Sequence, residues 1–275
     1  MPAILFSVED PAAANMMRRL MENHGWFEGQ KQLWGERPIH TFKSPEGVWA
    51  HGFPGRQVES DWLSEFVPGI RGNDLLIFAS THTSRAGVKA FAAHASGNWK
   101  TAALGGNAHE VSRTSARAIA TGLRFFDKHK LAGFAAVMEA THHGPTSLPA
   151  PSVWIELGSG PEQWKDEKAG EVAAKALLDV VWNHDRAKGK IAIGAGGTHY
   201  CPRFVKMILS GEYCFSHVAT KHSLPVDLKT WRQAVERTSE KVEALVIDEK
   251  GVTAAQREEL RKVAEELDLE FVRAR

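Results

Sequence analysis

Short apolar runs that end in polar residues are the dominant pattern along this chain. The runs at residues 75–82, 134–143 and 190–199 each end in histidine, the last after a glycine-rich turn. Weaker copies occupy residues 88–94 and 153–160. Apolar runs of this length, bounded by glycine or proline, predict buried β-strands. If the strands are parallel, their carboxyl ends meet at one edge, where open α/β sheets bind ligands.

Segments with helical periodicity separate these runs. Asp10 and Pro11 supply a cap and a first-turn proline for a helix at residues 12–23. Residues 88–94 suit either a strand or a short helix. A capping box at Ser159–Glu162 predicts a helix that runs to about residue 182. Other helices are expected at residues 61–66, 110–128 and 229–237, and two more begin at residue 202 and after Thr253. Further strands are expected at residues 4–8, 38–42, 244–248 and 269–272. The order predicts one α/β domain over residues 1–275, with a mixed, largely parallel sheet flanked by helices.

Composition narrows the class of protein. A formal charge of +1 over 275 residues gives no global field that would select nucleic acid, so any such contact needs a local patch. Cys201 and Cys214 are the only cysteines, which excludes a disulfide framework and a thiolate zinc knuckle. No apolar run approaches the roughly 20 residues of a membrane span, and the N-terminal segment lacks the basic leader of a signal peptide. We therefore expect a cytoplasmic protein without membrane contact.

The strongest chemical signal lies at the end of the 134–143 run. Glu139, His142 and His143 precede a Gly144–Pro145 break. In an extended strand, residues 139 and 143 share a face and His142 points the other way, so both histidines serve one site only if the chain bends. The Gly-Pro pair favours that bend. The alternative is that both histidines are hydrogen-bonded at an ordinary strand end and have no chemical role. His82 and His94 are single histidines at strand ends, and each could likewise be functional or purely structural.

The glycine-rich turn at residues 194–199 has two plausible uses. Backbone N–H groups of Gly194, Gly196 and Gly197 could hold an anion, while His199 binds metal or moves a proton. The turn matches neither the dinucleotide nor the Walker motif, and a tight turn that only needs small residues explains it equally well. Ser159 lacks a nucleophile elbow, so a serine hydrolase is not favoured.

One local basic surface is predicted on the helix at residues 110–128. Helical periodicity places Arg113, Arg117, Arg124 and Lys128 on one face. Such a stripe suits contacts to successive phosphates, which position a nucleic acid without reading its bases. The alternative is the solvated face of an amphipathic helix.

Five motifs follow one another along the chain. They are Ser80-Thr81-His82, His94 to Trp99, Ala140 to Pro145, Ile155 to Ser159 with Trp164, and Ile193 to Tyr200. With these motifs in this order, the chain resembles the archaeal and plant D-aminoacyl-tRNA deacylases of the second type. That likeness implies an esterase that frees D-amino acids from mischarged tRNA, with zinc and a phosphorylase/hydrolase-like fold akin to peptidyl-tRNA hydrolases. It also favours a strand at residues 88–94.

The resemblance, carried over by position, suggests roles for the matching residues. We expect zinc on His82, His142 and His199, with Glu156 or Glu139 as fourth ligand or general base. His143 and His94 would orient ligands or transfer protons. Substrate contacts are expected from Asn98, the glycines at 194, 196 and 197, and the stripe of Arg113, Arg117, Arg124 and Lys128. The partner is D-aminoacyl-tRNA, and we expect a monomer without an obligatory protein partner.

Two other functions fit the same residues. A zinc exopeptidase or amidohydrolase would use the strand-end site on a small acyl or peptide substrate. A non-catalytic tRNA-binding module would use the histidines only to shape a pocket.

Overall fold

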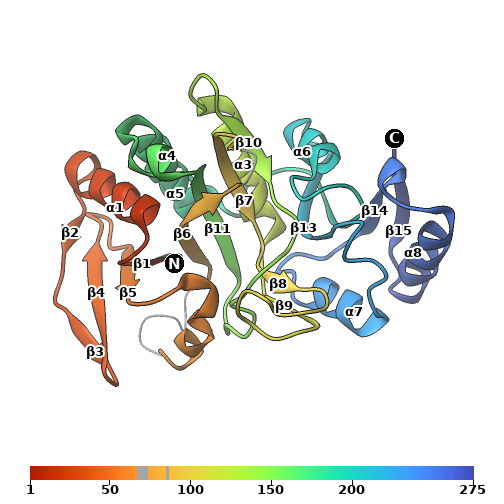
Figure 1. Ribbon diagram of the computed structural model, residues 1–275, viewed down its shortest axis with the longest axis horizontal. Coiled ribbons are helices and arrows are strands. Elements are labelled where there is room, and N and C mark those ends of the chain that lie inside the picture. The colour runs from red at the N-terminus through yellow and green to blue at the C-terminus, as the bar shows by residue number, and fades with distance from the viewer. Residues whose placement is uncertain (67–73, 85–86) are drawn as a thin grey trace.

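Two main sheets organise the chain in the computed structural model, which describes residues 1–66, 74–84 and 87–275 (Figure 1). The larger sheet has the strand order β10-β7-β11-β6-β1-β5-β4-β2, with β3 paired to β4. Its strands are β1 (Ala3–Ser7), β2 (Phe27–Glu28), β3 (Gln32–Trp34), β4 (Arg37–Lys43), β5 (Trp49–Phe53), β6 (Leu76–Thr83), β7 (Ala90–His94), β10 (Ala135–Met138) and β11 (Ser152–Ser159). The smaller sheet has the order β13-β12-β14-β15, formed by β12 (Lys190–Ala195), β13 (Tyr213–Ala219), β14 (Ala244–Asp248) and β15 (Glu270–Ala274). A short ribbon joins β8 (Gly97–Asn98) to β9 (Glu110–Val111).

Strand direction changes within the larger sheet. β6 is parallel to both β1 and β11, and β10 is parallel to β7, but β11 and β7 are antiparallel. The smaller sheet is parallel throughout. The predicted mixed, largely parallel α/β architecture is thus confirmed, as is the strand at residues 88–94. The expectation that the predicted strands end at one shared edge is wrong, because β7 and β10 run opposite to β6 and β11.

Three helices cover one face of the larger sheet. They are α1 (Pro11–His24), α3 (Ala116–His129) and α5 (Glu167–Asn183) (Figure 1). Gly122 of α3 lies directly against the side chains of Ile155 and Ala93, so a larger residue there would displace the helix. Burying a side chain such as Ile155 stabilises the fold by about 1.5–3 kcal/mol. Side chains alternate along a strand, so the neighbouring Glu156 and His94 face away from these helices.

The opposite face is partly apolar and partly polar. Phe78 and Trp154 stack with ring centroids 4.5 Å apart, and the 3₁₀ segment η1 (Gln57–Glu65) packs near them through Leu63 and Val58. Farther along β6, β7 and β11 the same face carries Ser80, His82, His94 and Glu156 in place of apolar residues. The polar residues singled out in the sequence therefore lie on the face of the sheet, not at its edge.

Several helix boundaries differ from the predictions. α3 begins at Ala116, after Ser115 caps it, because residues 110–111 belong to β9. Ser159 is the last residue of β11 and not a cap, so α4 (Pro161–Lys165) starts after Gly160 and Asp166 caps α5 separately. The remaining helices are α6 (Pro202–Leu209), α7 (Leu228–Glu236), the 3₁₀ turn η2 (Glu249–Gly251) and α8 (Ala254–Glu266), the last with the capping box predicted at Thr253. None of the helices in the described part of the chain is both long and apolar enough to cross a membrane.

Candidate functional site

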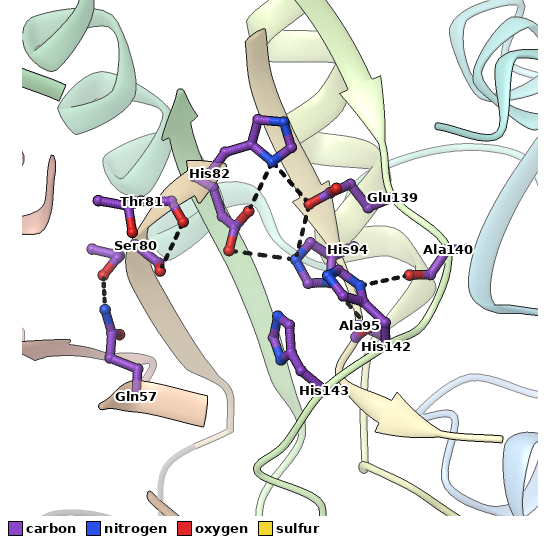
Figure 2. A network of polar contacts seen from close by, with 12 residues as sticks. Gln57, Ser80, Thr81, His82, His94, Ala95, Glu139, Ala140, His142 and His143 are labelled. Carbon is purple, nitrogen blue, oxygen red and sulfur yellow. Dashed lines mark hydrogen bonds and ion pairs between the residues drawn. The ribbon is translucent and has the colours of Figure 1, made fainter. Parts of the chain in front are cut away.

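A cavity of about 440 Å³ opens on the polar face of the larger sheet. Histidines and carboxylates form one end of it, and the first residues after β1 and the start of η1 form the other end. Figure 2 shows the two groups across from one another, with Gln57 and Ser80 on one side and His94 and His143 on the other. The side chains that line it most closely include Glu9, Asp10, Gln57, Ser80, Thr81, His82, Glu139, His142, His143, Trp154, Glu156 and His199.

Strand register brings the polar side chains together. Glu156 of β11 is paired with Ser80 of β6, and His94 of β7 is paired with Trp154 of β11. Met138 ends β10 opposite Ala93, which places Glu139 next to His94. A side-chain period of two puts Ser80, His94, Trp154 and Glu156 on one face, whereas Ala93 and Met138 point to the helices. A shift of one residue in any pairing would turn its contribution into the helix layer.

Two buried carboxylates hold two imidazoles between them. Nδ1 of His82 lies 3.1 Å from Glu139 and 3.6 Å from Glu156, and Nε2 of His94 lies 3.5 Å from Glu156 and 3.7 Å from Glu139. Burial alone would lower the pKa of His82, but hydrogen bonds to both carboxylates raise it to about 11. The pKa of His94 is also raised, because Glu156 and Glu139 outweigh its burial. Two imidazolium charges thus balance two carboxylates that could not be buried alone.

Three histidines are fixed by their own backbone. Nδ1 of His94, His142 and His143 lies 3.1, 2.8 and 2.7 Å from the carbonyl oxygens of Ala95, Ala140 and Gly144. A carbonyl only accepts, so Nδ1 carries hydrogen in each ring and Nε2 faces the other way. The predicted bend between strand and Gly-Pro turn is present, since His143 adopts a φ of 51° and the three rings pack on each other. Figure 2 shows them gathered beside Glu139.

His142 and His143 remain neutral where His82 and His94 do not. Burial lowers the pKa of His142 to about 4, and the charge of His94 adds to that effect. Burial also lowers the pKa of His143 well below its usual value. Neutral imidazole is the form that coordinates metal or accepts a proton. The cluster therefore offers both charged and neutral imidazoles within one cavity.

His199 closes the cluster at the mouth of the cavity. Its Nε2 lies 2.6 Å from Glu139, and its side chain is 47% exposed. Burial would raise the pKa of Glu139, but hydrogen bonds from His199 and His82 hold it well below its usual value. The hydroxyl of Tyr200 lies 3.0 Å from Nε2 of His82. Tyr200 was not among the predicted site residues, although it belongs to the motif that contains His199.

Three overlapping groups have the geometry to hold a metal ion. Within each group, one nitrogen or oxygen atom per residue lies within 4.8 Å of the others. The predicted ligands His82 and His142 fall in different groups, whereas His142 and Glu139 each belong to two. Among the described residues, the groups are His94 with His142 and His143, Glu139 with His142 and His199, and His82 with Glu139 and Glu156.

The glycine turn and Asn98 lie outside the cavity. The amide of Gly196 donates to the carbonyl oxygen of Ala219 and is not free for a phosphate, and the carboxylate of Asp248 lies close to Gly197. Gly194 is a buried residue of β12. Asn98 donates to the carbonyl oxygens of Gly105 and Asn107 and so fixes the loop beside the site.

The predicted basic stripe is not one helical face. Arg113 precedes the cap of α3, so it is not part of the helix. Arg117 donates to Ala187, and Arg124 donates to Ile208 and Lys188, which ties both guanidinium groups to backbone carbonyls. Lys128 is exposed near the end of α3. Because α3 covers the opposite face of the sheet, the stripe does not border the cavity.

Two supporting residues escaped the sequence pattern altogether. Gln57 and His217 lie in segments whose local patterns suggested no chemistry. His217 on β13 is fully buried and bonds to the hydroxyl of Thr141, next to His142. Such contacts depend on long-range packing, which residue spacing does not reveal.

A sheet face with clustered buried imidazoles and carboxylates is the arrangement of a hydrolytic enzyme centre. The sequence profile of the D-aminoacyl-tRNA deacylase family matches residues 71–272. A D-aminoacyl-tRNA deacylase of Thermococcus kodakarensis is 33% identical to this chain, and the match covers 99% of this chain and 100% of the relative. A D-aminoacyl-tRNA deacylase of Pyrococcus abyssi is 32% identical, with the same coverage of both chains. The chain therefore belongs to the D-aminoacyl-tRNA deacylase family, as its motifs predicted.

A solved structure supports the fold. A crystal structure described as a conserved protein of unknown function superposes with a TM-score of 0.87 at 29% identity, covering 100% of this chain and 95% of the other.

Proposed function

We propose that this protein hydrolyses the ester between a D-amino acid and the terminal ribose of tRNA, and that the histidine–carboxylate cluster is its catalytic centre. The observation that carries the assignment is the cluster itself. Six of its side chains (His82, Glu139, His142, His143, Glu156 and His199) line one cavity in a chain that belongs to the deacylase family.

The residues fit a zinc ion. The donors are only imidazole nitrogens and carboxylate oxygens, and the neutral ring of His142, whose Nδ1 donates to Ala140, has an unprotonated Nε2. His142 would hold the ion together with Glu139 and His199. Zinc, when bound, supplies a Lewis acid that polarises the ester carbonyl and activates water.

The protein's own groups can carry the proton transfers. Nε2 of His143 is the unprotonated nitrogen of a neutral ring, so it can accept a proton from the attacking water. The same nitrogen can return the proton to the ribose 3′ oxygen as the ester bond breaks. His82, charged between Glu139 and Glu156, contributes positive charge beside the carbonyl oxygen as that oxygen becomes anionic.

A single substitution tests the assignment. His142→Ala should reduce release of D-tyrosine from D-Tyr-tRNA by at least about 100-fold, with an unchanged circular dichroism spectrum. His129→Ala is the matched control, because His129 is exposed on α3 across the sheet. Activity of the His142 variant equal to that of the control would remove the cluster from the mechanism.

Salt dependence separates this function from a small-molecule peptidase. Deacylation of tRNA should weaken steeply as salt rises, whereas cleavage of a short peptide should hardly change. Metal analysis addresses zinc independently: a fully active preparation free of metal would refute zinc but leave the deacylase intact.

A further inference from the structure

The end of the cavity opposite the histidines contains a polar atom that lacks a partner. Gln57 is 5% exposed and lines the cavity, and its Oε1 is buried with no hydrogen bond to any described residue. Nε2 of the same amide donates to Asp10 at 3.1 Å and to the carbonyl oxygen of Ala79 at 3.0 Å. Both partners only accept, so the amide cannot be flipped and Oε1 is truly the free acceptor.

The surroundings of Gln57 are anionic. Asp10 and Glu9 lie at this end of the cavity, and Arg56, the one guanidinium among the described residues that line it, is paired with Glu59. Asp10 has no acceptor capacity left, because it takes hydrogen bonds from Ala12, Ala13, Gln57 and both the amide and hydroxyl of Thr81. Glu9 is exposed and accepts one hydrogen bond, from the amide of Gly55, so the buried acceptor left for a ligand at this end is the Gln57 carbonyl, within the field of two carboxylates.

We propose that Gln57 receives the α-ammonium group of the aminoacyl ester, an assignment that rests on the proposed function. An ammonium group needs acceptors and negative surroundings, and an unpaired buried acceptor costs about 1–3 kcal/mol until a donor reaches it. Arg56 does not compete, since Glu59 holds it at 2.6 Å.

Strand pairing connects Gln57 to the cluster. Its amide bonds to Ala79, the residue before Ser80, and Ser80 is paired with Glu156 on the neighbouring strand. Gln57, Glu156 and four of the histidines line the same cavity. In the proposed binding mode the ester carbonyl lies at the histidine cluster and the α-nitrogen points to the Gln57 end.

This contact also explains how handedness can be recognised. With the ester carbonyl at the cluster and the ammonium group at Gln57, only the side chain and the hydrogen on the α-carbon remain to be placed. D- and L-residues exchange these two positions. Gln57 thus acts as a specificity-determining residue, because it fixes the second of the points that chiral selection requires.

The test compares two tRNA esters on the intact enzyme. D-Phe-tRNA carries the ammonium group, and D-phenyllactyl-tRNA has a hydroxyl in its place. After correction for their spontaneous hydrolysis rates, wild-type kcat/KM should favour D-Phe-tRNA by at least about tenfold, as expected for one charge-assisted hydrogen bond. Gln57→Met should reduce that preference to about one and lower the D/L ratio.

Gln233→Met is the matched control, because Oε1 of Gln233 is also buried without a hydrogen-bond partner in the described part of the chain, but Gln233 lies on α7, away from the cavity. A wild-type preference near one overturns the proposal even if Gln57→Met fails to fold. An equal loss on both esters in Gln57→Met also overturns it, since that result indicates only a structural role. If the wild type cleaves neither ester, it is the proposed function that fails.

Discussion

His217 provides a prediction whose size can be worked out in advance. The side chain is fully buried on β13; its Nε2 lies 3.1 Å from the carbonyl oxygen of Ser112 and its Nδ1 lies 3.2 Å from the hydroxyl of Thr141. Nε2 must donate to that carbonyl, so Nδ1 accepts from Thr141. Burial lowers the pKa of His217 to about 3. His217→Gln removes the titrating group while leaving a side chain that can still donate and accept.

The direction of the pH effect follows from proton linkage. In the unfolded chain a histidine has a pKa of about 6.5, so below that pH the unfolded state binds a proton that folded His217 refuses. The free energy of unfolding then falls by about 1.4 kcal/mol per pH unit, down to the folded-state pKa near 3. Between pH 6.5 and 5 the wild type loses about 2 kcal/mol on this account, and the variant loses none.

The measurement is urea unfolding by far-ultraviolet circular dichroism at pH 7.5, 6.5 and 5. At pH 7.5 the variant should be less stable than the wild type by about 1–3 kcal/mol, because the hydrogen bonds are imperfectly replaced. The difference should shrink by about 2 kcal/mol at pH 5. His51 and His142 titrate in both proteins and cancel in the difference. A stability gap that stays constant with pH would refute the buried neutral imidazole.

Further predictions concern the cluster and the far face of the sheet. Glu139→Gln should lower kcat by at least about 100-fold, measured by single-turnover deacylation, and should reduce the zinc content, measured by elemental analysis. An unchanged kcat together with an unchanged zinc content would contradict a role of Glu139 in both catalysis and metal binding. Dialysis against a chelator should abolish activity and stoichiometric zinc should restore it. Protonation of His142 should not affect the activity of the wild type between pH 8 and 6, because the pKa of this ring is about 4. The activity should fall toward pH 4, where the ring gains a proton. Arg124→Ala should cost about 1–3 kcal/mol of stability without changing KM for tRNA; a large increase in KM would restore the basic stripe as a tRNA contact.

The fold was largely predictable where burial leaves a local pattern. The apolar runs at residues 75–82 and 190–199 correspond to β6 and β12, because strands covered on both faces need continuous apolar sequence. The antiparallel pairing of β7 with β11 was not predictable, since a run of side chains is the same in either direction. α3 was expected six residues early for a similar reason: residues 110–115 are compatible with a helix, but β8 and Ser115 determine its start.

The site was predictable as a set of residues but not as an arrangement. The motifs contained His82, His94, Glu139, His142 and His143, and the structure brings them together. Their charge states depend on distances to carboxylates and on backbone carbonyls, which no motif encodes. Gln57 was not predicted, because its proposed role depends on its Oε1 atom, which accepts no hydrogen bond from any described residue.

The backbone anchors of the three histidines have a consequence for evolution. Each ring is oriented by a carbonyl within two residues of it: Ala95 for His94, Ala140 for His142 and Gly144 for His143. Distant residues need only bring these short segments together. Helices α1, α3 and α5 can therefore diverge in sequence without disturbing the rings, provided that the strand pairing beneath them is kept. Homologous proteins with little overall identity can share this arrangement of histidines, and its segments are natural units for transfer to another sheet.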